Sequence, residues 1–157
     1  MSIMATLPLV LMFMLPAQQT PAPDPGVVSR GDHAMGFSHD TTTHHFRLYK
    51  SGGTIEVVAN DPTDLQSRDQ IRMHLSHITK KFSAGEFDVP MFIHDTTPPG
   101  APTMSKLHDQ IRYQLEETPQ GATIKITTKN NEALNAIHDF LRFQISDHKT
   151  GDSPDVR

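Results

Sequence analysis

Histidine is the residue type in this sequence best suited to chemistry. Ten histidines occur in 157 residues, and they are spread along the chain rather than gathered in one run. Cysteine is absent, which excludes thiolate ligands, thiol catalysis and disulfides. Neutral imidazole is the commonest protein ligand of transition metals. The composition therefore favours metal coordination by histidine over the other chemistries.

The clearest pair lies in "MHLSHI", residues 73–78, where His74 and His77 are three residues apart. In a helix this spacing places both rings on one flank of an apolar stripe, where two histidines can hold one metal ion. The alternative is two polar residues at the edge of a packed helix. A second predicted helix carries Phe140 and Phe143 at the matching positions, which favours a special role for the histidines.

Further candidate ligands lie around the first predicted strand, in "GFSHDTTTHHFRL". His44 alternates in phase with Phe46, so we expect it on the helix-covered face of a sheet, as the partner of His74 and His77. His45 would then lie on the open face. His39 precedes the strand, in a loop able to fold back. The alternative for His44 is a core histidine with a satisfied hydrogen bond.

A long Pro-rich link supplies Met91 and His94 in "MFIHD", with Met104 ten residues after His94. Imidazole with thioether is a ligand set for copper, especially Cu(I), whereas zinc would prefer carboxylates such as Asp40 or Asp95. The alternative is that Met91 packs on the sheet and His94 is exposed. In the last predicted helix, His148 lies in the final turn, where the helix dipole alone favours a cationic ring.

These patterns predict one metal site and a set of weaker candidates. The predicted ligands are His44, His74, His77, His94, Met91 and Met104, and the weaker candidates are His39, His45, His138 and His148.

The elements that must position these residues form two copies of a hairpin followed by a helix. Alternating apolar residues around "KSGG" and around "TPQG" predict two β-hairpins. Apolar stripes at helical spacing follow each hairpin, with Thr63 and Gln66 as a capping box for the first helix and Asn130 or Asn131 as the cap of the second. The fold prediction is α+β: two ββα units, about 42–85 and 109–151, forming a four-stranded antiparallel sheet with two helices on one face.

The first residues predict export. Residues 5–15 form an uncharged apolar run that is shorter than the roughly 20 residues of a membrane span, as in a signal peptide, although no Lys or Arg precedes it. We expect a signal peptide over 1–20, a Pro-rich tether over 21–30, one domain over 31–152 and a tail over 153–157. The predicted location is periplasmic or extracellular.

The sequence thus predicts an exported metal-binding protein, copper first and zinc second, for metal carriage, storage or sensing. Affinity would fall as the pH drops through about 6.5, where imidazole protonates. The alternatives are a haem or small-molecule binding module and a His-ligated metalloenzyme with an open coordination position. Enzyme function is not favoured, because no catalytic base is evident. A net charge of −4 disfavours nucleic acid, and no protein partner is indicated.

Overall fold

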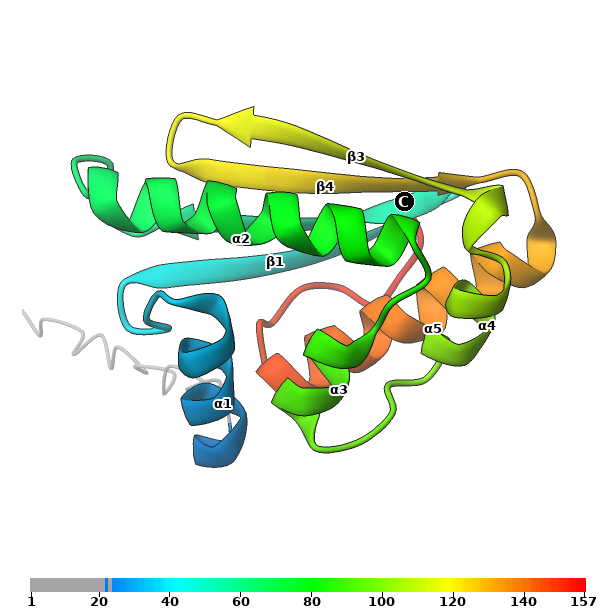
Figure 1. The fold of residues 1–157 in the computed structure, drawn as a ribbon, viewed down its shortest axis with the longest axis horizontal. Coiled ribbons are helices and arrows are strands. Elements are labelled where there is room, and N and C mark those ends of the chain that lie inside the picture. The colour runs from blue at the N-terminus through cyan, green and yellow to red at the C-terminus, as the bar shows by residue number, and fades with distance from the viewer. Residues whose placement is uncertain (1–21, 23) are drawn as a thin grey trace, which may run out of the picture.

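The computed structural model describes residues 22 and 24–157, so the expected signal peptide lies outside the described residues. Figure 1 shows the elements in chain order: α1 (Pro25–Met35), β1 (Thr42–Tyr49), β2 (Gly52–Ala59), α2 (Leu65–Ser83), α3 (Asp88–His94), α4 (Ala101–Lys106), the 3-10 turn η1 (His108–Gln110), β3 (Ile111–Thr118), β4 (Gly121–Thr128) and α5 (Asn131–His148).

The four strands form one antiparallel sheet in the order β1-β2-β4-β3. Each hairpin pairs its own two strands, and β2 joins β4 at the centre, where Ile55 lies opposite Ile124. The sequence prediction of an α+β fold with ββα units is confirmed. In the part of the chain that the structure describes, no helix has both the length and the apolar character needed to cross a bilayer.

The two long helices cover the same face of the sheet, as the two-copy pattern predicts (Figure 1). Helix α2 packs over β4 and β3, and α5 packs over β1 and β2. The short helices α1 and α3 pack against each other, and α4 packs on α5. The link between α2 and β3 is therefore largely helical and adds to the helical layer.

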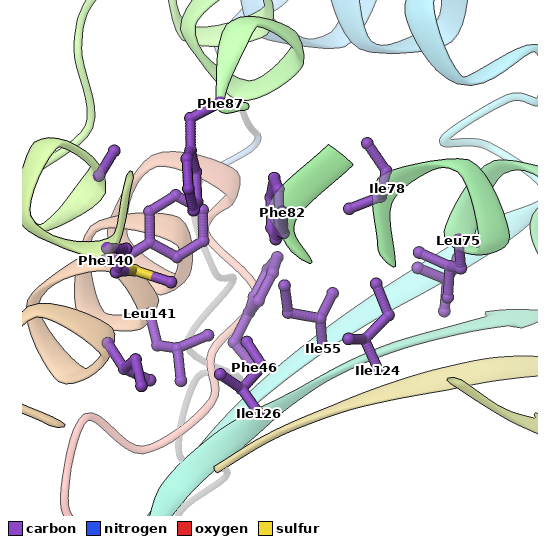
Figure 2. Close-up of a cluster of buried hydrophobic side chains, with 14 of the residues drawn as sticks. Phe46, Ile55, Leu75, Ile78, Phe82, Phe87, Ile124, Ile126, Phe140 and Leu141 are labelled. Carbon is purple, nitrogen blue, oxygen red and sulfur yellow. The ribbon is translucent and has the colours of Figure 1, made fainter. Parts of the chain in front are cut away.

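The core lies between the sheet and this helical layer. Figure 2 shows Phe46 and Ile55 rising from the sheet toward Ile78 and Phe82 of α2. Phe82 stacks on Phe87 with ring centroids 4.3 Å apart, and Phe140 of α5 meets both rings edge-on. Burial of this apolar surface is the main force that holds the helices on the sheet.

Helix α1 occupies part of the segment for which the sequence predicted a tether. It begins at Pro25, a residue suited to the first helical turn, and the side chain of Asp24 caps it by accepting from Gly26 N–H at 2.8 Å. Val27 is buried, and Arg30 Nε donates to the carbonyl of Ile93 at 2.8 Å. The segment from Pro25 onward therefore belongs to the fold.

Two helix boundaries differ from the sequence prediction. Asp64, not Thr63, caps α2, because its carboxylate accepts from Ser67 N–H at 2.9 Å while Thr63 is held by Asp61. Asn130, one of the two predicted caps, caps α5, and Lys149 ends the helix in the left-handed conformation at φ 49°, two residues before the Gly151 expected from sequence.

The segment after α5 covers the outer edge of β1. Val156 bridges to Leu48, and Arg157 N–H donates to the carbonyl of Leu48 at 3.0 Å. The Asp152 carboxylate accepts from Phe46 N–H at 2.9 Å. The segment over 153–157, which the sequence predicted as a tail, thus lies beside the sheet and protects an edge strand.

Candidate functional site

Four histidines from four different elements meet at one end of the helical layer. We call His39, His44, His94 and His148 the histidine cluster. The ring centroids of His39 and His44 are 5.4 Å apart, and those of His44 and His148 are 5.5 Å apart. His39 lies 6.0 Å from His148, and His94 lies 4.9 Å from His148. The planes of the first three rings differ by 20° or less.

The loop after α1 folds back and brings His39 into this cluster. Gly36, at φ 78°, ends α1 in the left-handed conformation and reverses the chain. The imidazole then lies against the helix at Gly31, where an added Cβ would be 2.7 Å from His39 Cε1. A glycine at position 31 therefore lets the ring pack against the helix.

Strand β1 and helix α5 supply the next two rings. His44 lies on the helix-covered face with Phe46, as the alternation predicts. His148 is the last residue of α5, which packs across β1, so its ring stacks on both His44 and Phe46. The dipole alone would favour a charged ring at this helix end, but His148 is only 8% exposed.

A carboxylate fixes the orientation of His39. Its Nδ1 lies 2.5 Å from Asp32 Oδ1, which also accepts from the His39 backbone N–H at 3.0 Å. A proton on Nδ1 leaves Nε2 as a free lone pair, and this buried atom has no hydrogen-bond partner among the described residues. The arrangement matches the carboxylate–histidine pair that orients metal ligands in many proteins.

His94 is held from both sides. Its Nδ1 bonds the carboxylate of Asp147, and its Nε2 lies 3.0 Å from the amide oxygen of Gln144. A ring that donates to both groups is charged, whereas turning the Gln144 amide over leaves the ring neutral. In either arrangement one polar atom of the buried Gln144 amide stays without a partner among residues 24–157.

Burial keeps several of these imidazoles neutral. Burial lowers the pKa of His148 to about 3, with His94 and His39 adding to the effect. Burial lowers the pKa of His44 well below its usual value, with His148 and His39 adding to that effect. His74, next to Phe37, has its pKa lowered to about 4 by burial and by His77. Protonation is thus displaced below the pH of 6.5 expected from sequence.

The cluster lies between a surface hollow and an apolar crevice. The hollow, of about 310 Å³, is lined by His39, His44 and His148 together with Lys149. The crevice, of about 60 Å³, lies under α1, α2 and α3 and is lined by His44, His74, His94 and His148. His44 and His148 line both spaces, so an ion in the hollow can reach their rings from the surface.

The structure brings together only part of the predicted metal site. His44 and His94 join the cluster, and His74 lies beside it at the crevice. His39 and His148, both weaker candidates by sequence, are at its centre. Of the two histidines predicted on this flank of α2, only His74 points into the crevice.

Three predicted ligands lie elsewhere, and each has a packing reason. His77 is exposed, because it lies about 60° further around α2 than His74, away from the core. Met104 is fully buried in the apolar core, where α4 packs on α5. Met91 is 42% exposed on α3 and faces a different pocket, beside Phe87. These three side chains therefore lie outside the histidine cluster.

Two other histidines have clear structural partners. His138 Nε2 lies 2.9 Å from the carbonyl of Tyr49 and 3.1 Å from that of Gly52, so it ties α5 to the β1–β2 hairpin. His45 Nδ1 lies 3.1 Å from Asp152 and helps to hold the C-terminal segment on β1. Neither ring belongs to the cluster.

Sequence reasoning missed the groups that support the cluster. Asp32, Asp147 and Gln144 contact its rings, and the thioether-bearing Met35 lines the crevice. Asp147 and Gln144 precede His148 by one and four residues on the same predicted helix. This spacing could have indicated that they support a site at His148. Asp32 gave no such signal, because its position depends on how the loop after α1 folds back.

Among the residues that the structure describes, no three His, Asp or Glu side chains are already arranged to hold a metal ion. The stacked rings bring the histidines together, but their nitrogens do not converge on one point. In comparisons with known proteins, no family, curated protein or solved structure matches this chain.

Proposed function

We propose that the histidine cluster binds one transition-metal ion, copper first and zinc second. The observation that carries the proposal is a pair of buried nitrogens, His39 Nε2 and His148 Nδ1, that lack a partner in the described part of the chain. Leaving a buried polar atom unpaired costs about 1–3 kcal/mol, so such atoms call for an explanation. A metal ion bound by both rings would offset that cost.

The spacing of the rings supports this reading. Two imidazoles on one metal ion have centroids about 5 Å apart, because each nitrogen lies about 2.0–2.1 Å from the metal. The centroid distances among His39, His44 and His148 are 5.4, 5.5 and 6.0 Å. Because Asp32 holds the His39 ring, the rings of His44 and His148 would have to rotate about their side-chain torsions to turn their nitrogens toward a common ion.

The imidazole nitrogens of the cluster favour copper over zinc. Imidazole binds Cu(II) more tightly than Zn(II) in the usual order of divalent ions. The thioether support from Met91 and Met104 is lost, since both lie outside the cluster. Met35 lines the crevice together with His44 and His148, so it is the candidate for a thioether ligand.

The proposed role is metal carriage, storage or sensing by an exported protein. Low pKa values for His44, His74 and His148 keep these rings in the form that binds metal. Haem is a weaker candidate, because a crevice of about 60 Å³ is far too small for a porphyrin unless the helices separate. A metalloenzyme would need a general base beside the metal, and no catalytic base is evident from the sequence.

The test is a metal titration of the full chain with Cu(II), Cu(I) under reductant, and Zn(II). The double variant His44→Phe/His148→Phe keeps the stacked rings and removes their nitrogens. The matched control is His33→Phe/His77→Phe, which changes two exposed histidines. We expect one ion per chain in wild type and control, and binding at least about 100-fold weaker in the cluster variant. Equal affinity in all three proteins would overturn the proposal.

A further inference from the structure

Strand β3 is an edge of the sheet whose outer side pairs with no other strand in the part of the chain that the structure describes. It is last in the order β1-β2-β4-β3 (Figure 1). Its register with β4 is continuous, from Ile111 opposite Thr128 to Thr118 opposite Gly121. The other edge strand, β1, is covered by the segment after α5, which includes Val156. The molecule therefore protects one edge of its sheet and leaves the other open.

The backbone groups that face outward from β3 follow from the ladder. Thr128 N–H donates to the carbonyl of Ser51 at 3.0 Å, so the backbone groups of Thr128 face β2 and not β3. Its partner Ile111 consequently directs its own N–H and C=O away from β4, because these groups alternate between the two sides of an antiparallel strand. By the same alternation, the residues of β3 whose backbone groups face outward are Ile111, Tyr113, Leu115 and Glu117.

The side chains of β3 divide between the two faces of the sheet. Those that pack against the core on the helix-covered face are Ile111, Tyr113 and Leu115. Those that are exposed on the open face are Arg112, Gln114 and Glu116. The strand contains no Pro or Lys, two residue types that proteins commonly place on edge strands to discourage pairing. On the open face, one positive and one negative side chain therefore lie on either side of an amide.

A second copy of the same strand fits this edge in one register. When two β3 strands run antiparallel about a two-fold axis at Gln114, Arg112 of each copy lies opposite Glu116 of the other. Tyr113 then lies opposite Leu115, and the outward backbone groups of these two residues form a hydrogen-bonded pair. Arg112 and Glu116 form a non-hydrogen-bonded pair, in which side chains are closest and unlike charges stabilise. Registers shifted by one pair in either direction place an uncharged residue opposite Arg112.

The helical layer leaves room for this approach. Helix α2 lies over β4 and β3, and on its flank above the end of β3 Arg72 donates to the carbonyl of Thr118 at 2.6 Å. Four and seven residues further along this flank are the short side chains of Ser76 and Thr79. In the paired sheet the two α2 helices would lie about two strand spacings apart, roughly 10 Å, which is a normal distance between packed helices.

We propose that two copies of this chain pair edge to edge through β3 and form a symmetric dimer with one continuous antiparallel sheet. The occupant of the edge is a second copy because β3 itself supplies both charges that select the register. Each copy then presents the same surface to the other, as a closed two-fold interface requires. The histidine cluster lies beside β1 at the opposite edge of the sheet, so this inference is independent of metal binding.

The experiment is analytical ultracentrifugation of the full chain over a range of protein concentrations. Arg112→Glu and Glu116→Arg each place like charges opposite one another across the two-fold axis. The double variant Arg112→Glu/Glu116→Arg restores unlike charges in the reverse order. The matched control is Lys125→Glu, which reverses an exposed charge on β4, one strand in from the edge.

We expect dimers of similar dissociation constant in wild type, in the double variant and in Lys125→Glu. Dimerisation should be at least about tenfold weaker in each single variant, because the symmetry doubles the effect of every substitution. As the dimer forms, the amide N–H groups of Tyr113 and Leu115 should exchange more slowly with solvent. Circular dichroism shows that each variant is folded.

Three results would overturn this inference. The first is a wild-type chain that stays monomeric up to its solubility limit. The second is a double variant that dimerises no more tightly than the single variants. The third is a dimer in which the amides of Tyr113 and Leu115 exchange as fast as in the monomer, because another surface must then hold the two copies together.

Discussion

At the scale of single residues, the histidines divide by what their ring nitrogens touch. His138 meets backbone carbonyls and has a structural role. His39 has one nitrogen on a carboxylate and the other unpaired and buried. An unpaired buried nitrogen lowers stability unless a ligand binds it. His39 and its partner Asp32 are therefore the residues at which metal binding by the cluster is best tested.

Asp32→Asn is expected to weaken metal binding about 10- to 100-fold, because the amide no longer fixes the proton on His39 Nδ1. The fold should persist, since the asparagine oxygen can still accept from the His39 backbone N–H. Isothermal titration with Cu(II) measures the change. The matched control is Asp139→Asn on the exposed face of α5, where the carboxylate is 61% exposed. Equal losses in the two variants would mean that Asp32 acts only through overall charge.

At the scale of elements, α5 has two duties. Its last residue, His148, enters the cluster, and His138 holds the turn between β1 and β2. These residues lie ten positions apart on one helix that crosses β1 and β2. The helix therefore carries a structural histidine and a proposed ligand at two separate positions.

Replacing His138 by alanine tests whether its contacts with the hairpin affect metal binding or only stability. The carbonyls of Tyr49 and Gly52 lose their buried donor, so we expect the free energy of unfolding to fall by about 2–3 kcal/mol. Metal stoichiometry and affinity should stay at the wild-type value once the protein is folded. Urea unfolding followed by metal titration measures both. His138→Gln retains a donor and should recover part of the stability, whereas a lost metal site would contradict the structural role.

The same scale explains what the sequence could predict. Periods of two and of about 3.6 residues are local, so the hairpins, the helix stripes and the inward face of His44 follow from the pattern. The meeting of His39 with His148 depends on how α1 and the loop after it fold back, which no local period encodes. The helix period placed His74 correctly and His77 wrongly, because the three residue steps between them turn the helix by about 60° net, which is enough to separate a boundary position from an exposed one.

At the scale of the whole molecule, the cluster joins segments far apart in the chain. His39 and His148 are stacked although more than a hundred residues separate them, and β1, α1, α3 and α5 must all be packed for the rings to meet. The site should therefore form only in the fully folded protein. A property of the site and the stability of the fold are then linked by thermodynamics.

Acid should destabilise the metal-free protein through these rings. A histidine whose pKa is lowered in the fold takes up its proton more readily when unfolded, so its contribution to stability is complete above about 6.5 and is lost as the pH falls toward the folded value. For His74 that value is about 4, which corresponds to at most about 3 kcal/mol. We expect the free energy of unfolding, measured with urea and a chelator, to fall across this window.

His74→Phe separates this effect from general acid unfolding, because it keeps a ring beside Phe37 and removes the titration. Its unfolding free energy should depend less on pH between 6.5 and 4 than that of wild type, and His77→Phe, at an exposed position of the same helix, should behave as wild type. Identical slopes in all three would show that His74 protonates without cost.

A bound metal should then oppose the acid effect in wild type, since protons and the ion compete for the same nitrogens of the folded cluster.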